Sequence, residues 1–252
     1  MSVDRRLRGE IDLAAVTGLP VLGQLPQIHR LEPINQSGDP ESPRELAEAY
    51  RALRATLRLA RSTAGGFQVI AVTSSMPGEG KSTVAARLAC ALAAAGNPTL
   101  LIDADMRKPT QHHQFDRPDG RGLSHVLAGA EAFQPVATSF AHLDLLICGP
   151  RPPNPAELLS GPALGDLLAQ ARGRYAHIVI DTPPLGAVTD ALLVAERADQ
   201  VVLVARDRVT DRAALARIVA RLKPLGARVV GCVLNAVRLR KGDAPYEYGG
   251  KA

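Results

Sequence analysis

The residues best suited to chemistry form a short glycine-containing segment that follows an apolar stretch. The segment reads Ser75-Met76-Pro77-Gly78-Glu79-Gly80-Lys81-Ser82 and continues into Thr83. It fits the phosphate-binding loop G-x-x-x-x-G-K-[ST], except that Ser75 stands where the pattern has its first glycine. Gly78 and Gly80 would let backbone N–H groups turn toward phosphates. We therefore predict a phosphate-binding loop over residues 75–83.

The polar side chains at the end of this loop have predicted roles. Lys81 would reach the β- and γ-phosphates of a nucleotide, and the Ser82 hydroxyl would ligate Mg²⁺. Thr83 lies in the first turn of the next helix, where the helix dipole favours negative charge. The alternative is a glycine-containing turn that binds nothing, and the order of strand, loop, Gly-Lys-Ser and helix argues against it.

Carboxylates follow two later apolar stretches. Asp103 and Asp105 come directly after Leu100-Leu101-Ile102, and Asp181 comes after Ile178-Val179-Ile180. Parallel strands bring their carboxyl ends to one edge of a sheet, so these side chains are expected near the phosphate-binding loop. There a carboxylate can hold Mg²⁺ or accept a proton from an attacking hydroxyl. The alternative for each is a helix cap after a strand.

The elements that must position these residues alternate along the chain. A helix is expected from Pro43 to about Arg61, because apolar residues recur there at helical spacing. Apolar strands are predicted at 67–73, 99–103, 143–148, 176–181, 200–205 and 228–234. Helices are predicted at 81–95, 156–171, 187–197 and 210–223. This pattern indicates an α/β fold of the P-loop NTPase type, with a doubly wound, mostly parallel sheet and helices on both faces.

Three segments are expected along the chain. Residues 1–42 read as an N-terminal arm with one short helix near 12–16, residues 43–236 as the P-loop domain, and residues 237–252 as a flexible tail.

Composition excludes several classes of protein. Of 252 residues, 46% are apolar and 22% charged, which is typical of a globular protein. Only 3% are aromatic and none is Trp, which argues against a stacking surface for nucleic acid. The three cysteines lie far apart, so neither a disulfide framework nor a zinc site is expected. The sequence shows no signal peptide and no apolar run that could span a membrane, so a cytoplasmic chain is expected.

Taken together, these motifs resemble the bacterial tyrosine kinases (BY-kinases) of capsule and exopolysaccharide assembly. Residues 73–83 are close to that family's loop, Asp103 and Asp105 are similar to its second acidic motif (Walker A′), and Asp181 to its Walker B motif. Asn235 resembles the residue that meets adenine in relatives, although a turn-forming role is the alternative.

One helix also matches the family. Glu48, Arg51 and Arg54 fit its Glu-x-x-Arg-x-x-Arg helix, which joins neighbouring catalytic domains into rings. On a helix these three residues form one charged stripe. The alternative is a solvated face with internal ion pairs.

The resemblance implies an ATP-dependent tyrosine autokinase that controls polysaccharide chain assembly and export. ATP and Mg²⁺ would bind the loop, with Mg²⁺ positioned by Ser82, Asp103 and Asp181. Either Asp103 or Asp105 would deprotonate the tyrosine hydroxyl. The acceptors would be Tyr246 and Tyr248 in the tail, whereas Tyr50 and Tyr175 lie in predicted elements and are expected to be structural.

The N-terminal arm resembles the segment after the second membrane helix in long members of the family. This implies either a membrane-bound activator or chain-length protein as partner, or a missing N-terminal membrane part. Both place the chain at the inner face of the plasma membrane. Two other functions stay open. One is a positioning or partition ATPase switch, but those proteins carry a lysine early in the loop where this chain has Met76, which argues against this function. The other is a nucleotide-binding scaffold without kinase activity.

Overall fold

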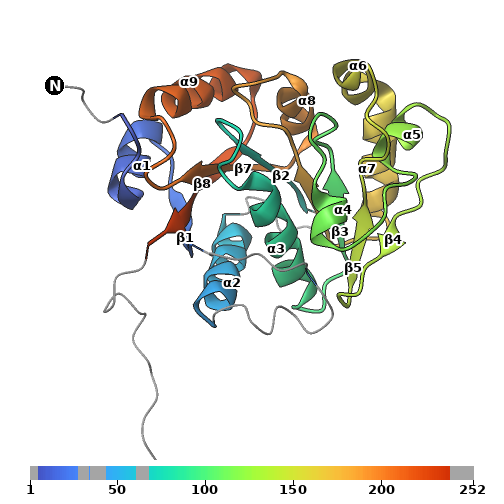
Figure 1. Cartoon of the computed structure of the whole chain (residues 1–252), viewed down its shortest axis with the longest axis horizontal. Helices are drawn as coiled ribbons and strands as arrows, with labels where there is room; N and C mark the ends of the chain where they lie inside the picture. Colours follow the sequence, from blue (N-terminus) through green and yellow to red (C-terminus); the bar gives the residue numbers. More distant parts are fainter. Residues whose placement is uncertain (1–4, 28–33, 35–43, 61–67, 239–252) are drawn as a thin grey trace, which may run out of the picture.

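The computed structural model describes residues 5–27, 34, 44–60 and 68–238. Within them the chain forms one eight-stranded sheet with the order β1-β8-β7-β2-β6-β3-β5-β4 (Figure 1). Only the pairing of β4 with β5 is antiparallel among these strands, so the predicted mostly parallel sheet is confirmed. The strands are β1 (Val21–Pro26), β2 (Gln68–Ser74), β3 (Thr99–Asp103), β4 (Val136–Ala137), β5 (Leu143–Leu146), β6 (His177–Asp181), β7 (Gln200–Arg206) and β8 (Val229–Val237).

Helices cover both faces of this sheet (Figure 1). Along β2, Ile70 and Val72 pack into a core shared with α2 and α3, whereas Val69 and Ala71 pack into a core shared with α7 and α8. A strand buried on both faces must be apolar throughout, which is why the sequence shows continuous apolar runs. The helices are α1 (Gly9–Thr17), α2 (Arg44–Leu59), α3 (Lys81–Ala93), α4 (Gln111–Gln114), α5 (Leu123–Leu127), α6 (Pro155–Ser160), α7 (Pro162–Arg172), α8 (Asp190–Arg197) and α9 (Arg212–Leu222), with the 3₁₀ turn η1 (Lys223–Leu225).

The N-terminal segment differs from its prediction. Residues 1–42 were expected to form an arm with one short helix near 12–16, and not a second domain. The helix is present as α1, but β1 also joins the sheet as a parallel neighbour of β8, with Leu22 buried in the core. The two strands come close at Gly231, where a Cβ atom would lie 2.5 Å from the carbonyl oxygen of Pro20. The apolar side chains of β1 therefore pack into the core of the sheet, and the division of the chain at residue 42 stays a prediction.

The predicted helix over residues 156–171 is two helices, α6 and α7. Gly161 between them has extended backbone dihedrals (φ −64°, ψ 168°), and Pro162 begins α7. Proline has no N–H to continue a helix and disfavours helical geometry in the residue before it. This break could have been read from the Gly-Pro pair.

Two of the four tyrosines of the chain are structural, as predicted. Tyr50 and Tyr175 are each 5% exposed and belong to hydrophobic cores. The hydroxyl of Tyr175 donates a hydrogen bond to Asp144 Oδ2 at 2.5 Å. Neither side chain is available as a phosphate acceptor on the surface.

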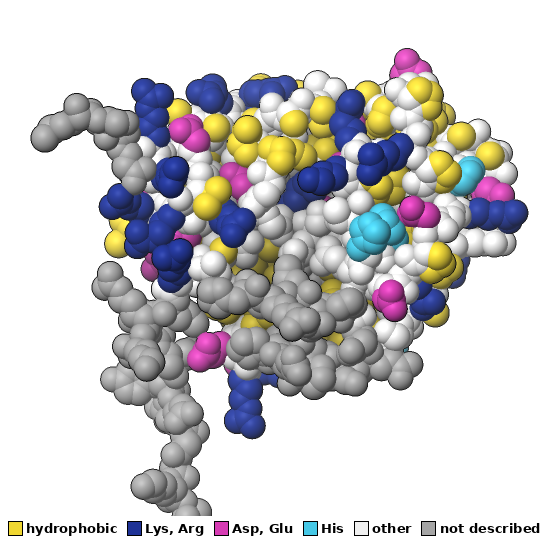
Figure 2. Space-filling model, in the orientation of Figure 1, with side chains coloured by type: hydrophobic (Ala, Val, Ile, Leu, Met, Phe, Trp, Pro, Cys, Tyr) yellow, Lys and Arg dark blue, Asp and Glu magenta, His cyan; other side chains and the backbone are white. Residues whose placement is uncertain are grey.

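The charge of the surface is mixed. Figure 2 shows Lys and Arg side chains scattered over the face that carries α1 and α9, with Asp and Glu side chains among them. In the described part of the chain, none of the helices combines the length and hydropathy needed to cross a membrane.

Candidate nucleotide site

The phosphate-binding loop joins the end of β2 to the first residue of α3. Gly78 and Gly80 have positive φ angles, +83° and +94°, which residues with a side chain rarely adopt. Gly80 also has no room for a Cβ atom, because that atom would lie 2.1 Å from Asn235 Nδ2. These two glycines are therefore required by the backbone, as the sequence motif predicted.

Beside this loop lies a cavity of about 580 Å³. Its walls come from the loop, the start of α3, the segment after β3, α4 and the segment after β6. The residues that line it are Ile34, Pro77, Gly78, Gly80, Lys81, Ser82, Thr83, Arg87, Asp105, Arg107, Lys108, Thr110, His113, Gln114, Pro183, Pro184, Ala187 and Val188. Several of the residues predicted from the motif thus face one shared space.

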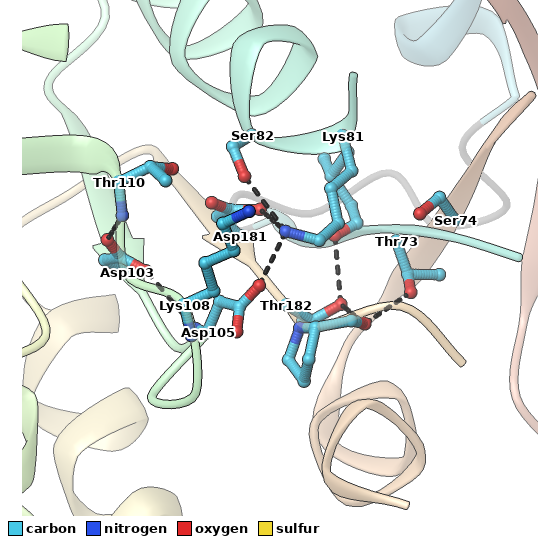
Figure 3. Close-up of polar contacts among 12 residues, drawn as sticks. Thr73, Ser74, Lys81, Ser82, Asp103, Asp105, Lys108, Thr110, Asp181 and Thr182 are labelled. Atoms are coloured by element: carbon cyan, nitrogen blue, oxygen red, sulfur yellow. Dashed lines mark hydrogen bonds and ion pairs between the residues drawn. The ribbon is translucent and has the colours of Figure 1, made fainter. Parts of the chain in front are cut away.

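Lys81 lies among carboxylates at the edge of this cavity (Figure 3). Its Nζ atom donates hydrogen bonds to Asp105 Oδ2 at 2.7 Å and Ser82 Oγ at 3.0 Å, and lies 3.6 Å from Asp181 Oδ1. Burial by itself lowers the pKa of Lys81, but the charges of Asp181 and Asp105 outweigh it, so the pKa is raised. The Lys81 ammonium group therefore stays protonated and supplies a positive charge beside the loop.

Asp181, at the end of β6, is fully buried. Its Oδ2 atom accepts a hydrogen bond from Gln111 Nε2 at 2.8 Å, whereas Oδ1 accepts none from the described residues. Burial raises the pKa of Asp181, and the nearby charge of Lys81 acts against that shift. A buried carboxylate oxygen without a donor, close to the Ser82 hydroxyl and the phosphate-binding loop, fits a hard cation such as Mg²⁺ or one of its waters.

The two aspartates after β3 have different surroundings. Asp103 is completely buried, and its oxygens accept hydrogen bonds from the backbone N–H groups of Asp105, Thr110 and Gln111 at 2.9–3.2 Å. Burial and the charge of Asp181 raise the pKa of Asp103 to about 8. Asp105 lines the cavity and contacts Lys81. Asp103 therefore organises the turn after β3, while Asp105 faces the reaction space.

An ion pair between the half-exposed Arg107 and the buried Asp190 holds the turn that carries Asp105. Arg107 donates to both carboxylate oxygens of Asp190, at 2.9 and 3.1 Å, and Asp190 at the start of α8 is fully buried. The backbone N–H of Lys108 donates to Asp105 Oδ1 at 3.0 Å. No sequence pattern points to Arg107 or Asp190, because the two residues are 83 positions apart in the chain and belong to no shared motif.

Three of the predicted nucleotide-binding residues do not line the cavity. The side chains of Ser75 and Glu79 are buried and hydrogen-bonded to each other, and neither residue lines the cavity. Asn235, at the end of β8, donates through Nδ2 to the backbone oxygen of Glu79 at 2.9 Å. These three residues support the loop in this structure, so their predicted contact with nucleotide stays a prediction.

Two other predicted sites lie elsewhere. Glu48 and Arg51 are exposed and form an ion pair on α2. Arg54, one turn further, donates to the backbone oxygen of Ala91 in α3 at 2.8 Å. The charged stripe thus exists on the surface but is partly tied to the domain's own α3. Tyr246 and Tyr248 lie outside the described residues.

The sequence of the chain matches known proteins over most of its length. Residues 70–247 match the family described as "CobQ/CobB/MinD/ParA nucleotide binding domain". The tyrosine-protein kinase YwqD of Bacillus subtilis is 38% identical over 207 residues, which are 81% of this chain and 87% of YwqD. The chain belongs to the bacterial tyrosine-protein kinases. It covers 29% of a longer relative, the tyrosine-protein kinase wzc of Salmonella typhimurium, at 37% identity over 211 residues.

The fold agrees with this membership of the tyrosine-protein kinases. The kinase domain of the Escherichia coli tyrosine kinase ETK superposes with a TM-score of 0.83 at 28% identity, covering 96% of this chain and 99% of the ETK domain. The resemblance that the motifs indicated is therefore confirmed, and the tyrosine-protein kinase reading is favoured over the positioning ATPase.

Proposed function

We propose that this tyrosine-protein kinase transfers the γ-phosphoryl group of ATP to tyrosine hydroxyls, chiefly those of its own tail in a neighbouring protomer. The observation that carries the proposal is that Lys81 and Asp105 are paired in the wall of one cavity, with the buried Asp181 3.6 Å from Lys81. The glycine-containing loop can surround phosphates, and the carboxylates supply a cation site and a proton acceptor.

The residues present fit Mg²⁺. Ser82 Oγ and Asp181 Oδ1 are hard oxygen ligands; Oδ1 accepts no hydrogen bond from the described residues and lies 3.6 Å from Lys81 Nζ, which also contacts Ser82 Oγ. Held by these two residues, Mg²⁺ would supply positive charge that offsets part of the charge of the phosphates. Asp103 was predicted as a third partner, but its oxygens are occupied by backbone donors, so we assign Mg²⁺ to Ser82 and Asp181.

The proton of the attacking tyrosine goes to Asp105 in this proposal. Asp105 is the carboxylate of the pair after β3 that lines the cavity, so it can approach the acceptor hydroxyl. The tyrosine oxygen forms its bond to the γ-phosphorus while the bond to the ADP oxygen breaks, and Asp105 takes the hydroxyl proton. Lys81 remains protonated and moves from the carboxylates toward the phosphates, where it offsets the developing charge.

The acceptors we propose are Tyr246 and Tyr248. Tyr50 and Tyr175 are buried, which leaves these two among the four tyrosines of the chain. Fully extended, a tail of about 16 residues reaches roughly 50 Å, enough to enter an adjacent protomer. Phosphorylation adds a charge of about −1.5 to −2 to each tyrosine, and repulsion from the site carboxylates would then release the tail.

Assembly and location are part of the same proposal. Glu48, Arg51 and Arg54 would contact a neighbouring protomer in a ring. The resemblance to capsule and exopolysaccharide kinases supports a role in polysaccharide assembly and export. The longer relative wzc extends well beyond the matched region, which is consistent with a membrane-bound partner or membrane segment that holds this domain at the inner face of the membrane.

Transfer between protomers can be tested with two complementary variants. The donor carries Tyr246→Phe and Tyr248→Phe, which remove both acceptor hydroxyls. The acceptor carries Lys81→Met, which disables its own site and keeps its tail. After mixing with Mg–ATP, mass spectrometry should find phosphate on the tail tyrosines of the acceptor, and almost none on either variant incubated alone.

Three other results would contradict the proposal in different ways. A donor that carries as much phosphotyrosine as wild type would show that the tail is not the substrate. Wild type that hydrolyses ATP without forming phosphotyrosine would favour the positioning ATPase. Wild type that binds ATP and neither hydrolyses nor transfers it would favour the scaffold.

A further inference from the structure

The phosphate-binding loop contains a buried carboxylate, that of Glu79. Glu79 is 1% exposed, and its Oε1 accepts hydrogen bonds from the hydroxyls of Ser75 at 2.8 Å and Thr210 at 2.5 Å. Its Oε2 accepts from the backbone N–H of Met76 at 2.9 Å and again from Ser75 at 3.0 Å. Burial raises the pKa of Glu79, and the hydrogen bonds from Thr210, Met76 and Ser75 act against that shift. A carboxylate is costly to bury, so this one is retained with a full set of donors.

Two backbone carbonyl groups of the loop also accept hydrogen bonds from side chains at the ends of β7 and β8. Arg206, at the end of β7, donates through Nη1 to the carbonyl oxygen of Gly78 at 3.0 Å. Asn235 donates to the carbonyl oxygen of Glu79. Thr210 is itself fixed, since its hydroxyl also accepts the backbone N–H of Arg206 at 2.8 Å. The ends of β7 and β8 thus hold the carbonyl groups of two consecutive loop residues, and Thr210, in the turn before α9, holds the side chain of Glu79.

The hydrogen bonds to these two carbonyl groups also orient the N–H groups on the opposite side of the loop. In a planar trans peptide the carbonyl oxygen and the following N–H point in opposite directions. With the carbonyls of Gly78 and Glu79 held toward β7 and β8, the N–H groups of Glu79 and Gly80 are directed away from those strands. Those N–H groups belong to the part of the motif that surrounds phosphates.

We propose that Glu79 and Thr210 are positioning residues, which act through the loop backbone and hold its N–H groups in the arrangement that binds phosphate. Neither residue is part of the cavity lining, so the side chains of Glu79 and Thr210 act without touching the nucleotide. Ser75 is part of the same hydrogen-bonded group. It stands where the usual loop pattern has its first glycine, and its hydroxyl donates to Glu79. The inference rests on the proposed nucleotide binding.

The decisive variant is Thr210→Val, which keeps the shape of the side chain and removes the hydroxyl. Calorimetric titration with Mg–ADP measures binding without any turnover. A hydrogen bond to a charged group is lost, so we expect the Kd for Mg–ADP to rise about 10-fold or more. Thr210→Ser restores the hydroxyl and should bring the Kd back to within about 3-fold of wild type.

Thr17→Val provides a matched control. Thr17 is also a buried threonine, and its hydroxyl donates to the backbone oxygen of Leu13 at 2.7 Å within α1. This variant should lower the Tm in the same way as Thr210→Val and leave the Kd for Mg–ADP unchanged. Should Thr210→Val not fold, Ser75→Ala removes the other hydroxyl donor to Glu79 and should also weaken Mg–ADP binding.

Specific results would overturn the inference. One is a folded Thr210→Val with wild-type affinity for Mg–ADP, and another is a loss of affinity that Thr210→Ser does not restore. A third is an equal loss in Thr17→Val, which would show that the effect is general destabilisation. If wild type binds Mg–ADP but forms no phosphotyrosine, the proposed kinase reaction fails while the positioning role is still measured by the same titration.

Discussion

Replacement of Lys81 by methionine tests the electrostatics of the site and its chemistry together. The substitution keeps the length of the side chain and removes the charge that lies 2.7 Å from Asp105 and 3.6 Å from Asp181. Both aspartates are almost fully buried. Removing one partner of a buried ion pair costs about 3–5 kcal/mol, because the remaining charge is left uncompensated.

A carboxylate left without its partner can bind a proton, and this limits the loss of unfolding free energy to a value that depends on pH. For a carboxyl group with the ordinary pKa of about 3.9, the free-energy cost of binding a proton is about 4 kcal/mol at pH 7 and about 1.5 kcal/mol at pH 5. In Lys81→Met the carboxylate of Asp181, whose pKa is already raised by burial, can take this route. The loss of unfolding free energy should therefore be roughly 3–4 kcal/mol at pH 7 and at most about 1.5 kcal/mol at pH 5.

The assay is urea denaturation of nucleotide-free protein at both pH values, followed by autophosphorylation at pH 7. The rate of phosphotyrosine formation should fall about 10²–10⁴-fold, which corresponds to about 3–5 kcal/mol of lost transition-state stabilisation. Lys223→Met is the matched control, since Lys223 is exposed on η1. A stability loss that stays the same from pH 7 to pH 5, or a folded variant with the wild-type rate, would refute the reasoning.

Two further predictions concern Asp103 and the charged stripe. The pKa of Asp103 is raised to about 8 in the folded protein. The stability that its bound proton contributes should therefore be complete below about pH 4 and lost as the pH rises through 8. In urea titrations of nucleotide-free protein, Asp103→Asn should show a smaller decline of the unfolding free energy over this pH range than wild type. Replacing Arg51 and Arg54 by alanine should shift an oligomeric wild type toward monomer in light scattering and reduce phosphorylation in trans, and equal masses for the two proteins would reject the ring contact. Arg54→Ala alone also removes the hydrogen bond to Ala91, so a stability loss of about 1 kcal/mol is expected.

Features encoded within one stretch of chain could be predicted from the sequence. The phosphate-binding loop is contiguous, and the positive φ angles of Gly78 and Gly80 follow from glycine itself. The buried strands were visible as apolar runs, and the parallel sheet was expected to bring Asp105 and Asp181 to the loop. The family followed from these same local motifs.

Only the tertiary structure decided which polar groups meet across the chain. Glu79 and Thr210 are 131 residues apart, and Arg107 and Asp190 are 83 apart. No local spacing links such partners, because their contact depends on the order in which the strands lie in the sheet. The same holds for Asp103 and Asp105, which are equivalent in sequence until the turn after β3 directs one into backbone donors and the other toward Lys81. Local patterns fix backbone conformation and burial, whereas the partner of a buried charge is set by which elements pack against it.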